Sequence, residues 1–426
     1  MAGAAGGRPA AGAPQSWRVL LALYSITSLI EGLGVSQIFA FMLLRLRSMG
    51  VSGHEASTLV GLLSPLVFVL GLPIVPLWGV WADKHSRKVV IVRSAVVEAV
   101  VFGAVALSRT PLELAGALLL VGFQLGNTGV MIAALRDVVP PHRLGTAVSV
   151  FGASSSVGFA IGPLLGALMV RVLHTSLDAV YWTSAALSVG VALMLSFGSR
   201  EVRPEVVPEG RAWDLALRAV RGVFTSSSTR LLFAAYGALL LARQMLGPYL
   251  PLLAVRAAGH GGSAVLAIGI VTGVSALAGA LISPAAGALG DRIGFRPVLV
   301  ASLALGAVAV ATMPLAGSVA ILAPVAAVVA ALGVAAASMV TALLARETPP
   351  ERRSATLNLV LLPLYVGGIV GPAIGAGVVQ VGLPWVFVVA AALMAGGIAP
   401  GTARPGPVDG RAAPAEGASG APGGRR

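Results

Sequence analysis

The sequence contains no cysteine among its 426 residues. It therefore forms no disulfide bond and offers neither a thiol nucleophile nor a thiolate ligand for a metal ion. Its five histidines include no pair at the spacing with which a helix holds a metal. We therefore expect no metal site and no cofactor.

Charged residues are also scarce, at 11% of the chain, whereas about 25% of the residues in soluble domains are charged. Hydrophobic residues make up 57%, so polar side chains are too few to cover a surface in water, and lipid has to solvate the protein. This composition excludes a soluble enzyme, a nucleic-acid-binding domain and a disordered protein. The net charge of +13 needs another explanation than nucleic acid.

Long apolar stretches take up most of the chain. A helix needs about 20 apolar residues to cross the hydrocarbon core of a membrane. The sequence predicts twelve such spans: 19–43, 55–80, 89–108, 112–135, 144–170, 179–198, 231–255, 264–288, 297–316, 318–344, 355–380 and 383–400. We therefore expect an all-α polytopic membrane protein, with disordered tails at 1–16 and 401–426, where few side chains could form a core.

The basic residues lie mainly on one side of these spans. If both termini are cytoplasmic, 23 of the 29 Lys and Arg residues fall on the cytoplasmic side and five on the other. This bias is the positive-inside pattern, and it accounts for the net charge. The abundance of Arg over Lys, with much Ala, Gly and Val, is typical of a GC-rich bacterial genome. We therefore expect a multi-pass protein of a bacterial plasma (inner) membrane with both termini in the cytoplasm.

The second half of the sequence repeats motifs of the first. GVWADKHSRKVVIV at 79–92 matches GALGDRIGFRPVLV at 287–300, and GFAIGPLLGA at 158–167 matches GGIVGPAIGA at 367–376. RDVVPPHR at 136–143 matches RETPPERR in the same order and at nearly the same offset. The repeat predicts two parallel six-helix halves, as in transporters that bind substrate between such halves. The predicted parts are the halves 17–198 and 231–400 and the cytoplasmic linker 199–230.

These motifs resemble those of the major facilitator superfamily of secondary transporters, over roughly residues 17–400. The family's signature between spans 2 and 3 is Gly-x-Leu-x-Asp-Arg-x-Gly-Arg-Lys. The residues that match it are Gly79, Asp83, Arg87 and Lys88, and in the second half Gly287, Leu289, Asp291, Arg292, Gly294 and Arg296. The fifth-span signature of the drug–proton antiporters appears as Gly158, Gly162, Pro163 and Gly166, and again as Gly367, Gly371, Pro372 and Gly375. The Arg of their fourth-span signature is absent, and Gly122 lies at about that position.

The resemblance implies two mechanical devices. Asp83, with Arg87, Lys88 and Arg136 as partners, would form a cytoplasmic gate that Asp291, Arg292 and Arg296 repeat in the second half. The alternative is a topology signal made of solvated charges. Gly79 and Gly287 would let a helix end turn sharply. The glycines of the fifth span recur every four residues, so the helix around Pro163 is either a hinge or a site of static close packing.

Two charges lie in the middle of predicted spans, where an ionisable residue is costly and indicates a site. Glu31 is central in the first span and Arg243 in the seventh, which are equivalent helices of the two halves. The repeat puts them at similar depth, so they could form a pair across the cavity, either at the transport site or as a structural lock. The other candidates for substrate or proton binding are Tyr24 and Ser28 on the face of Glu31, Tyr236 on the face of Arg243, and Gln124 and Asn127 in the fourth span. Glu98, in the third span, is expected to make a structural bond within one half.

We therefore expect a proton-coupled exporter, an antiporter that moves small organic or amphipathic compounds by alternating access. Glu31 would carry the proton, and Arg243 would tune it or hold an anionic group. The expected partners are substrate, protons and the lipid bilayer, and the protein is expected to be a monomer. The alternatives are an uptake symporter for a metabolite and a non-transporting membrane sensor or scaffold. Catalytic residues are not expected, because the chain has no Cys, no His pair and no mid-span Asp pair. No P-loop motif for an ATP-driven pump is present.

Overall fold

The computed structural model describes residues 15–51, 53–202, 227–347 and 362–402, and all the regular elements within them are helices. Nearly all of the predicted tails 1–16 and 401–426, most of the linker 199–230 and the start of the predicted span 355–380 lie outside the described residues. The helices are α1 (Trp17–Ser48), α2 (Gly53–Leu63), α3 (Leu66–Val69), α4 (Gly71–Lys84), α5 (Arg87–Leu107), α6 (Pro111–Gln124), α7 (Asn127–Val138), α8 (Pro141–Arg171), α9 (Leu177–Gly198), α11 (Ser227–Ala258), α12 (Ala264–Ile293), α13 (Phe295–Thr312), the 3-10 turn η1 (Met313–Leu315), α14 (Val319–Glu347), α16 (Leu362–Val378), α17 (Leu383–Gly396) and α18 (Ile398–Thr402).

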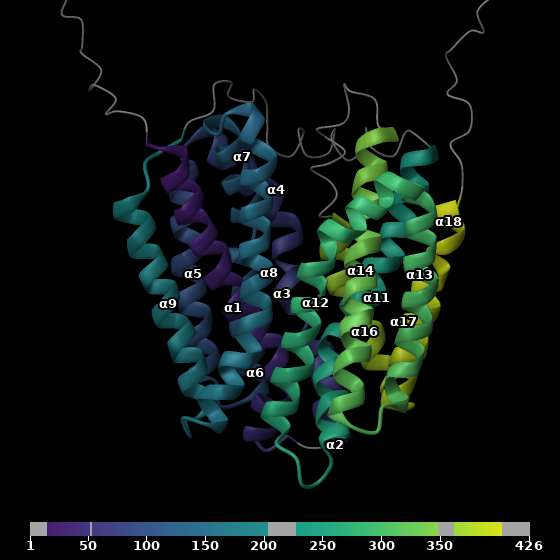
Figure 1. Cartoon of the computed structure of the whole chain (residues 1–426). Helices are drawn as coiled ribbons and strands as arrows, with labels where there is room; N and C mark the ends of the chain where they lie inside the picture. Colours follow the sequence, from purple (N-terminus) through teal and green to yellow (C-terminus); the bar gives the residue numbers. More distant parts are fainter. Residues whose placement is uncertain (1–14, 52, 203–226, 348–361, 403–426) are drawn as a thin grey trace, which may run out of the picture.

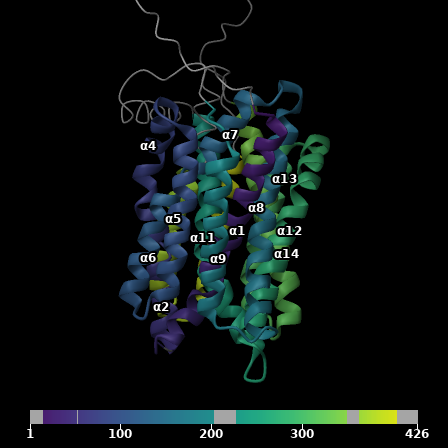
Figure 2. The same cartoon turned by 90° about the vertical axis from the view of Figure 1, so that its left-hand side faces the viewer.

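The predicted all-α polytopic architecture is confirmed. Within the described residues, eleven helical stretches are long and apolar enough to cross a membrane, and α16 is a shorter apolar helix in the position of the eleventh predicted span. The long helices run up and down in both views (Figures 1 and 2). Figure 1 shows them as two groups, α1 to α9 and α11 to α18, which we call the first and second halves. The described chain begins and ends at the same end of the bundle, the upper end in Figure 1. We call this the terminal end and the other the distal end.

Two of the predicted spans in the first half are not continuous helices. The second span is divided into α2, α3 and α4, with Pro65 directly before α3, and a proline lacks the N–H that would continue a helix. The fourth span is divided into α6 and α7 at Gly126, which has a φ of 100°. Glycine adopts this left-handed backbone conformation at little energetic cost. The length of an apolar stretch in the sequence does not by itself predict either break.

Close backbone packing joins α1 to α8 and, in the same manner, α11 to α16. A Cβ atom added at Gly158 of α8 would overlap the carbonyl oxygen of Leu29, and one at Gly162 would overlap the carbonyl oxygen of Leu33. In the second half, a Cβ at Gly371 would lie 2.8 Å from the carbonyl oxygen of Leu241. The glycine motifs therefore act as close packing surfaces within each half.

The two halves meet at the distal end through a second pair of equivalent contacts. A Cβ at Gly61 of α2 would lie 2.9 Å from the carbonyl oxygen of Pro372 in α16. A Cβ at Gly269 of α12 would likewise lie 2.9 Å from the carbonyl oxygen of Pro163 in α8. Gly61 and Gly269 are related by the internal repeat, and so are the two prolines. Two symmetric helix pairs, α2 with α16 and α8 with α12, therefore close the distal end.

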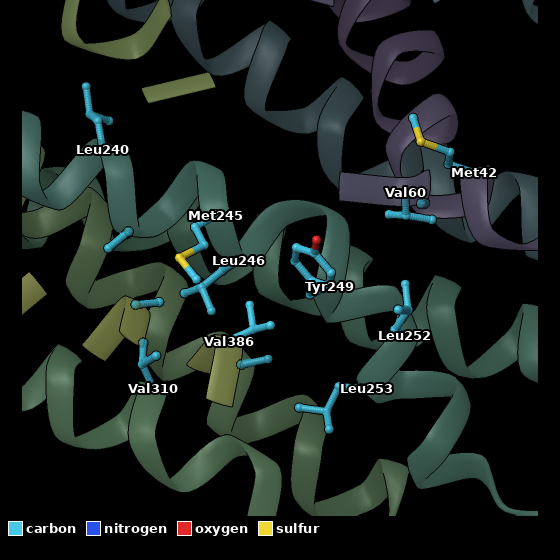
Figure 3. Packing of buried hydrophobic residues seen from close by; sticks show 14 of the residues in the cluster. Met42, Val60, Leu240, Met245, Leu246, Tyr249, Leu252, Leu253, Val310 and Val386 are labelled. Atoms are coloured by element: carbon cyan, nitrogen blue, oxygen red, sulfur yellow. The ribbon is translucent and has the colours of Figure 1, made fainter. Parts of the chain in front are cut away.

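Tyr249 of α11 reinforces this closure. Figure 3 shows Tyr249 between buried residues of the second half, such as Met245, and Met42 and Val60 of the first half, and all of them belong to one hydrophobic cluster. A Cβ at Gly61 would overlap the hydroxyl oxygen of Tyr249. The hydrophobic core thus continues across the interface between the halves at this end.

Candidate functional site

Glu31 lies in the middle of α1, half-buried, and is held by two side-chain amides. Its Oε2 accepts a hydrogen bond from Asn127 Nδ2 at 3.0 Å, and its Oε1 accepts one from Gln124 Nε2 at 3.4 Å. Gln124 is the last residue of α6 and Asn127 the first of α7. The break at Gly126 therefore places both amides, which are themselves buried, against the same carboxyl group.

The second half presents Tyr365 of α16 to Glu31, close enough for the charge of the carboxylate to act on the phenol. The ring of Tyr365 packs edge-on against Phe68 of α3, with 6.1 Å between the ring centroids. Glu31 thus lies where the first half faces the second.

The structure does not pair Glu31 with Arg243. No ion pair joins Arg243 to any carboxylate of the described chain. Arg243 is exposed, and the aliphatic part of its side chain lies beside Gly333 of α14. Its charge acts on Tyr236, which precedes it on α11 by seven residues, about two helical turns. The structural lock between the halves is therefore absent from this conformation. Equal depth along two helices does not fix the direction in which each side chain points.

Within the described residues, no hydrogen bond joins Tyr24 or Ser28 to the carboxyl group of Glu31. Both are buried, and Tyr24 belongs to a hydrophobic cluster of the first half that includes Val90 and Met131. Helical spacing put them on the face of Glu31, but that face continues into the packed interior of the half toward the terminal end. The residues that the structure gathers around Glu31 are therefore Gln124, Asn127 and Tyr365.

The predicted gate cluster is an ion-pair network inside the first half. Arg87, at the start of α5, is 3% exposed. Its guanidinium pairs with Asp83 at 2.8 Å and with Asp137 of α7 at 2.6 Å. Arg87 thus ties the end of α4 and the start of α5 to the end of α7. Asp137, which sequence reasoning did not single out, is the second carboxylate of this network.

The other basic residues of the motif have different partners from Asp83. Lys88 Nζ donates to the carbonyl oxygens of Ser196 and Ser199, both at 2.7 Å, at the end of α9. The side chain of Arg136 is 64% exposed and lies 4.0 Å from Asp137. The expectation that Lys88 and Arg136 hold Asp83 is therefore wrong for this conformation, because open carbonyls and a nearer acid compete for them.

Glu201 is a second acid that sequence reasoning missed at this end. It accepts a hydrogen bond from the backbone N–H of Arg87 at 2.8 Å and another from the hydroxyl of Ser86. The first N–H groups of a helix have no partner within the helix and attract a carboxylate. In the sequence, Glu201 belongs to the predicted linker after the sixth span. The helix start at Arg87 is the signal that could have predicted a carboxylate cap.

The second copy of the motif is built differently. Asp291 and Arg292 are exposed at the end of α12, and neither makes an ion pair with another described residue. Arg296 donates to the carbonyl oxygen of Gly401 at 3.2 Å. Gly79 lies inside α4 and Gly287 inside α12, so the expected sharp turns at these glycines are wrong.

A buried arginine at the distal end was also missed. Arg45 of α1 is 3% exposed, forms an ion pair with Asp178 at the start of α9, and donates to the carbonyl oxygens of Ala106 and Ser108 at the end of α5, at 2.7 and 2.6 Å. Sequence reasoning counted it only as a loop charge. Its role is structural, since it fastens the distal ends of three helices. Within the described residues no group of three His, Cys, Asp or Glu side chains could hold a metal ion.

Comparisons with known proteins identify the family of this chain. The family described as the Major Facilitator Superfamily matches residues 24–267 and 232–422. The multidrug resistance protein MdtG of Salmonella typhi is 27% identical over 297 residues, which cover 68% of this chain and 71% of that protein. MdtG of Enterobacter lignolyticus is 27% identical over 300 residues, 69% of each chain.

Solved transporters share the fold at lower identity. The nucleoside transporter NupG has a TM-score of 0.70 at 16% identity, over 91% of this chain and 99% of that one. The human organic anion transporter MFSD10 has a TM-score of 0.68 at 19% identity, over 91% and 100% of the two chains. At these identities, the structural similarity shows only that the fold is shared. The family match over nearly the whole chain shows that the protein is a multi-pass membrane transporter, not an enzyme, and that it belongs to the major facilitator superfamily.

Proposed function

We propose that this secondary transporter couples proton entry to the export of small amphipathic organic compounds, and that Glu31 carries the proton. The observation that carries the proposal is the environment of Glu31 in the middle of α1. Neutral amides hold its carboxyl group, and no Lys or Arg of the described chain forms an ion pair with it. The amides stabilise the carboxylate, while the apolar surroundings favour the protonated form, so the group can exchange a proton during the transport cycle.

Export is supported by two further observations. The fifth-span motif around Pro163 resembles that of drug–proton antiporters, and the MdtG proteins that share 27% identity with this chain are named multidrug resistance proteins. Arg243, exposed and with no carboxylate partner among the described residues, is suited to an anionic or electron-rich group of the substrate.

The same proposal includes the orientation of the protein. The positive-inside pattern puts the terminal end in the cytoplasm of a bacterium, with the chain in the inner membrane as a monomer. The closed distal end would then face the outside, and the conformation described here would be the one open to the cytoplasm. Alternating access would follow when the contacts of α2 with α16 and of α8 with α12 separate.

The test is transport by purified protein in liposomes with an imposed proton gradient, using a panel of amphipathic cations, anions and neutral compounds. We expect the wild type and Glu113→Gln, a change at an exposed acid of α6, to drive at least one compound against the proton flow. Glu31→Gln should lose gradient-driven transport but keep exchange of labelled for unlabelled compound, because it mimics the protonated state permanently.

Other outcomes would decide against parts of the proposal. Movement of a compound in the same direction as the protons would make the protein an uptake symporter. Transport that does not respond to the gradient, or that Glu31→Gln leaves fully coupled, would contradict proton coupling at Glu31.

A further inference from the structure

A second acid lies inside the first half without a charged partner. Glu98 is in the middle of α5, its side chain is 3% exposed, and its Oε1 has no hydrogen-bond partner among the described residues. A buried carboxylate without donors is costly, whereas a protonated carboxyl group needs far less solvation. The surroundings of Glu98 therefore determine whether it is held as an acid or as an anion.

Side chains from three other helices face this carboxyl group. Ser188 of α9 and Gln124 of α6 lie beside it, and Glu31 of α1 is near enough for the two acids to act on each other electrostatically. On its own helix, Ser94 lies one turn earlier and donates to the backbone oxygen of Gln124 at 2.7 Å. No Lys or Arg of the described chain forms an ion pair with Glu98.

The neighbouring hydrogen bonds leave acceptor oxygens to which a protonated Glu98 can donate. The hydroxyl of Ser188 donates its one proton to the backbone oxygen of Ser184 at 3.0 Å, so toward Glu98 it offers an acceptor. One N–H of the Gln124 amide donates to Glu31, so the amide group still offers Glu98 its oxygen as an acceptor and its second N–H as a donor. A Glu98 that carries a proton can donate to either oxygen, and an ionised Glu98 can donate to neither.

Gln124 therefore stands between two carboxyl groups of different exposure. Glu31 is half-buried where the halves face each other, and Glu98 is sealed inside the first half. Glu31 and Glu98 act on each other electrostatically. Two such carboxyl groups in apolar surroundings disfavour each other's charge, so the release of a proton from one depends on the state of the other.

We propose that Glu98 is a second proton-binding residue of the transporter, which shares a proton with Glu31 across Gln124. This inference rests on the proposed function, in which Glu31 carries the coupled proton, and it extends the proton site to a pair. The pair holds at least one proton throughout the cycle, so that Glu31 can ionise while Glu98 stays neutral.

Infrared spectroscopy of the purified protein in lipid nanodiscs tests the pair without any substrate. The absorption of protonated carboxyl groups is followed through a pH titration of the wild type, E98Q, E31Q and the control E113Q. We expect a protonated carboxyl band that E98Q removes and E113Q leaves. In E31Q this band should titrate at a pH that differs from that of the wild type by about one unit or more, because the neighbouring charge is gone. Gln124→Leu should change the same titration without removing an acid.

The inference is overturned if E98Q removes no band, or if the Glu98 band titrates alike in the wild type and in E31Q. If E98Q does not fold, Glu98→Asp replaces it, because a shorter acid should displace the band. Failure of the proposed function looks different. If Glu31 and Glu98 titrate as a pair but the protein shows no proton-driven transport, the pair exists and the proposed function in transport is wrong.

Discussion

Gly158 brings the backbones of α1 and α8 into contact, because it has no side chain to separate them. We predict that Gly158→Ala lowers the free energy of unfolding by about 1–3 kcal/mol, since the new Cβ overlaps the carbonyl oxygen of Leu29 and the helices must move apart. The measurement is thermal unfolding of the purified protein in detergent.

Gly152 is the matched control for this change. It lies in the same helix, and a Cβ there meets no neighbouring atom within 4 Å. Gly152→Ala should leave stability unchanged or raise it by about 0.5–1 kcal/mol, because alanine restricts the unfolded chain more than glycine. Equal effects of the two changes would show that the packing of α1 on α8 does not need a glycine at 158.

At this scale, the sequence predicted the central acid and its amide partners better than the other site residues. Glu31, Gln124 and Asn127 stand out because polar groups are costly within an apolar span. Arg243 stands out for the same reason, but its direction depends on the rotation of α11 about its axis and on the shape of the α14 surface near Gly333. The repeat offset predicts neither the rotation of α11 nor the shape of the α14 surface.

Among the elements, the broken fourth span is the one that builds the candidate site. Gly126 has a φ of 100°, a conformation that costs other L-residues about 1–2 kcal/mol. We predict that Gly126→Ala destabilises the protein by about that amount and also weakens proton-driven transport, because the amides of Gln124 and Asn127 then shift relative to Glu31. Thermal unfolding and liposome transport measure the two effects.

Gly129→Ala serves as the control in the same span. Gly129 lies within α7, and a Cβ there meets no neighbouring atom within 4 Å. Both its stability and its transport should match the wild type or exceed it slightly. A normal Gly126→Ala protein would contradict the argument that the break positions the amides.

The breaks show why helices were easier to predict than their interruptions. A window of about 20 apolar residues identifies a span by its total hydrophobicity. It responds little to one glycine or proline, which are common in membrane helices. Gly126 and Pro65 could be distinguished from other such residues only through their backbone angles and neighbours, which are tertiary properties.

For the whole molecule, the side of the membrane that each end occupies is a testable prediction. His85, after α4, and His260, between α11 and α12, are both exposed and lie at opposite ends of the bundle. We predict that a membrane-impermeant thiol reagent added to intact cells labels His260→Cys and not His85→Cys. Both should react after the cells are opened. The reverse pattern would place the basic end outside and contradict the positive-inside assignment.

The repeat also predicted the symmetry of the molecule better than its conformational state. Two matching halves follow from motifs such as those at Pro163 and Pro372, because each half forms the same helix contacts. Which end of the interface is closed depends on a small difference in free energy between two conformations that use the same helix surfaces. The local sequence does not fix that choice, and the contacts of Gly61 and Gly269 show it only once the structure is in view.

Closure of the distal end gives the last prediction. Gln380, just after α16, donates to Thr58 of α2 at 2.8 Å and is hydrogen-bonded to His54. If transport requires α2 and α16 to separate, a disulfide between Thr58→Cys and Gln380→Cys should hold the protein closed at this end. We expect oxidation to stop exchange of labelled compound across liposomes and a reductant to restore it, while each single variant stays active. The natural sequence has no cysteine, so the added pair is the only source of disulfides within the chain. Full exchange by cross-linked protein would mean that substrate crosses without separation of these helices, which alternating access between the halves does not allow.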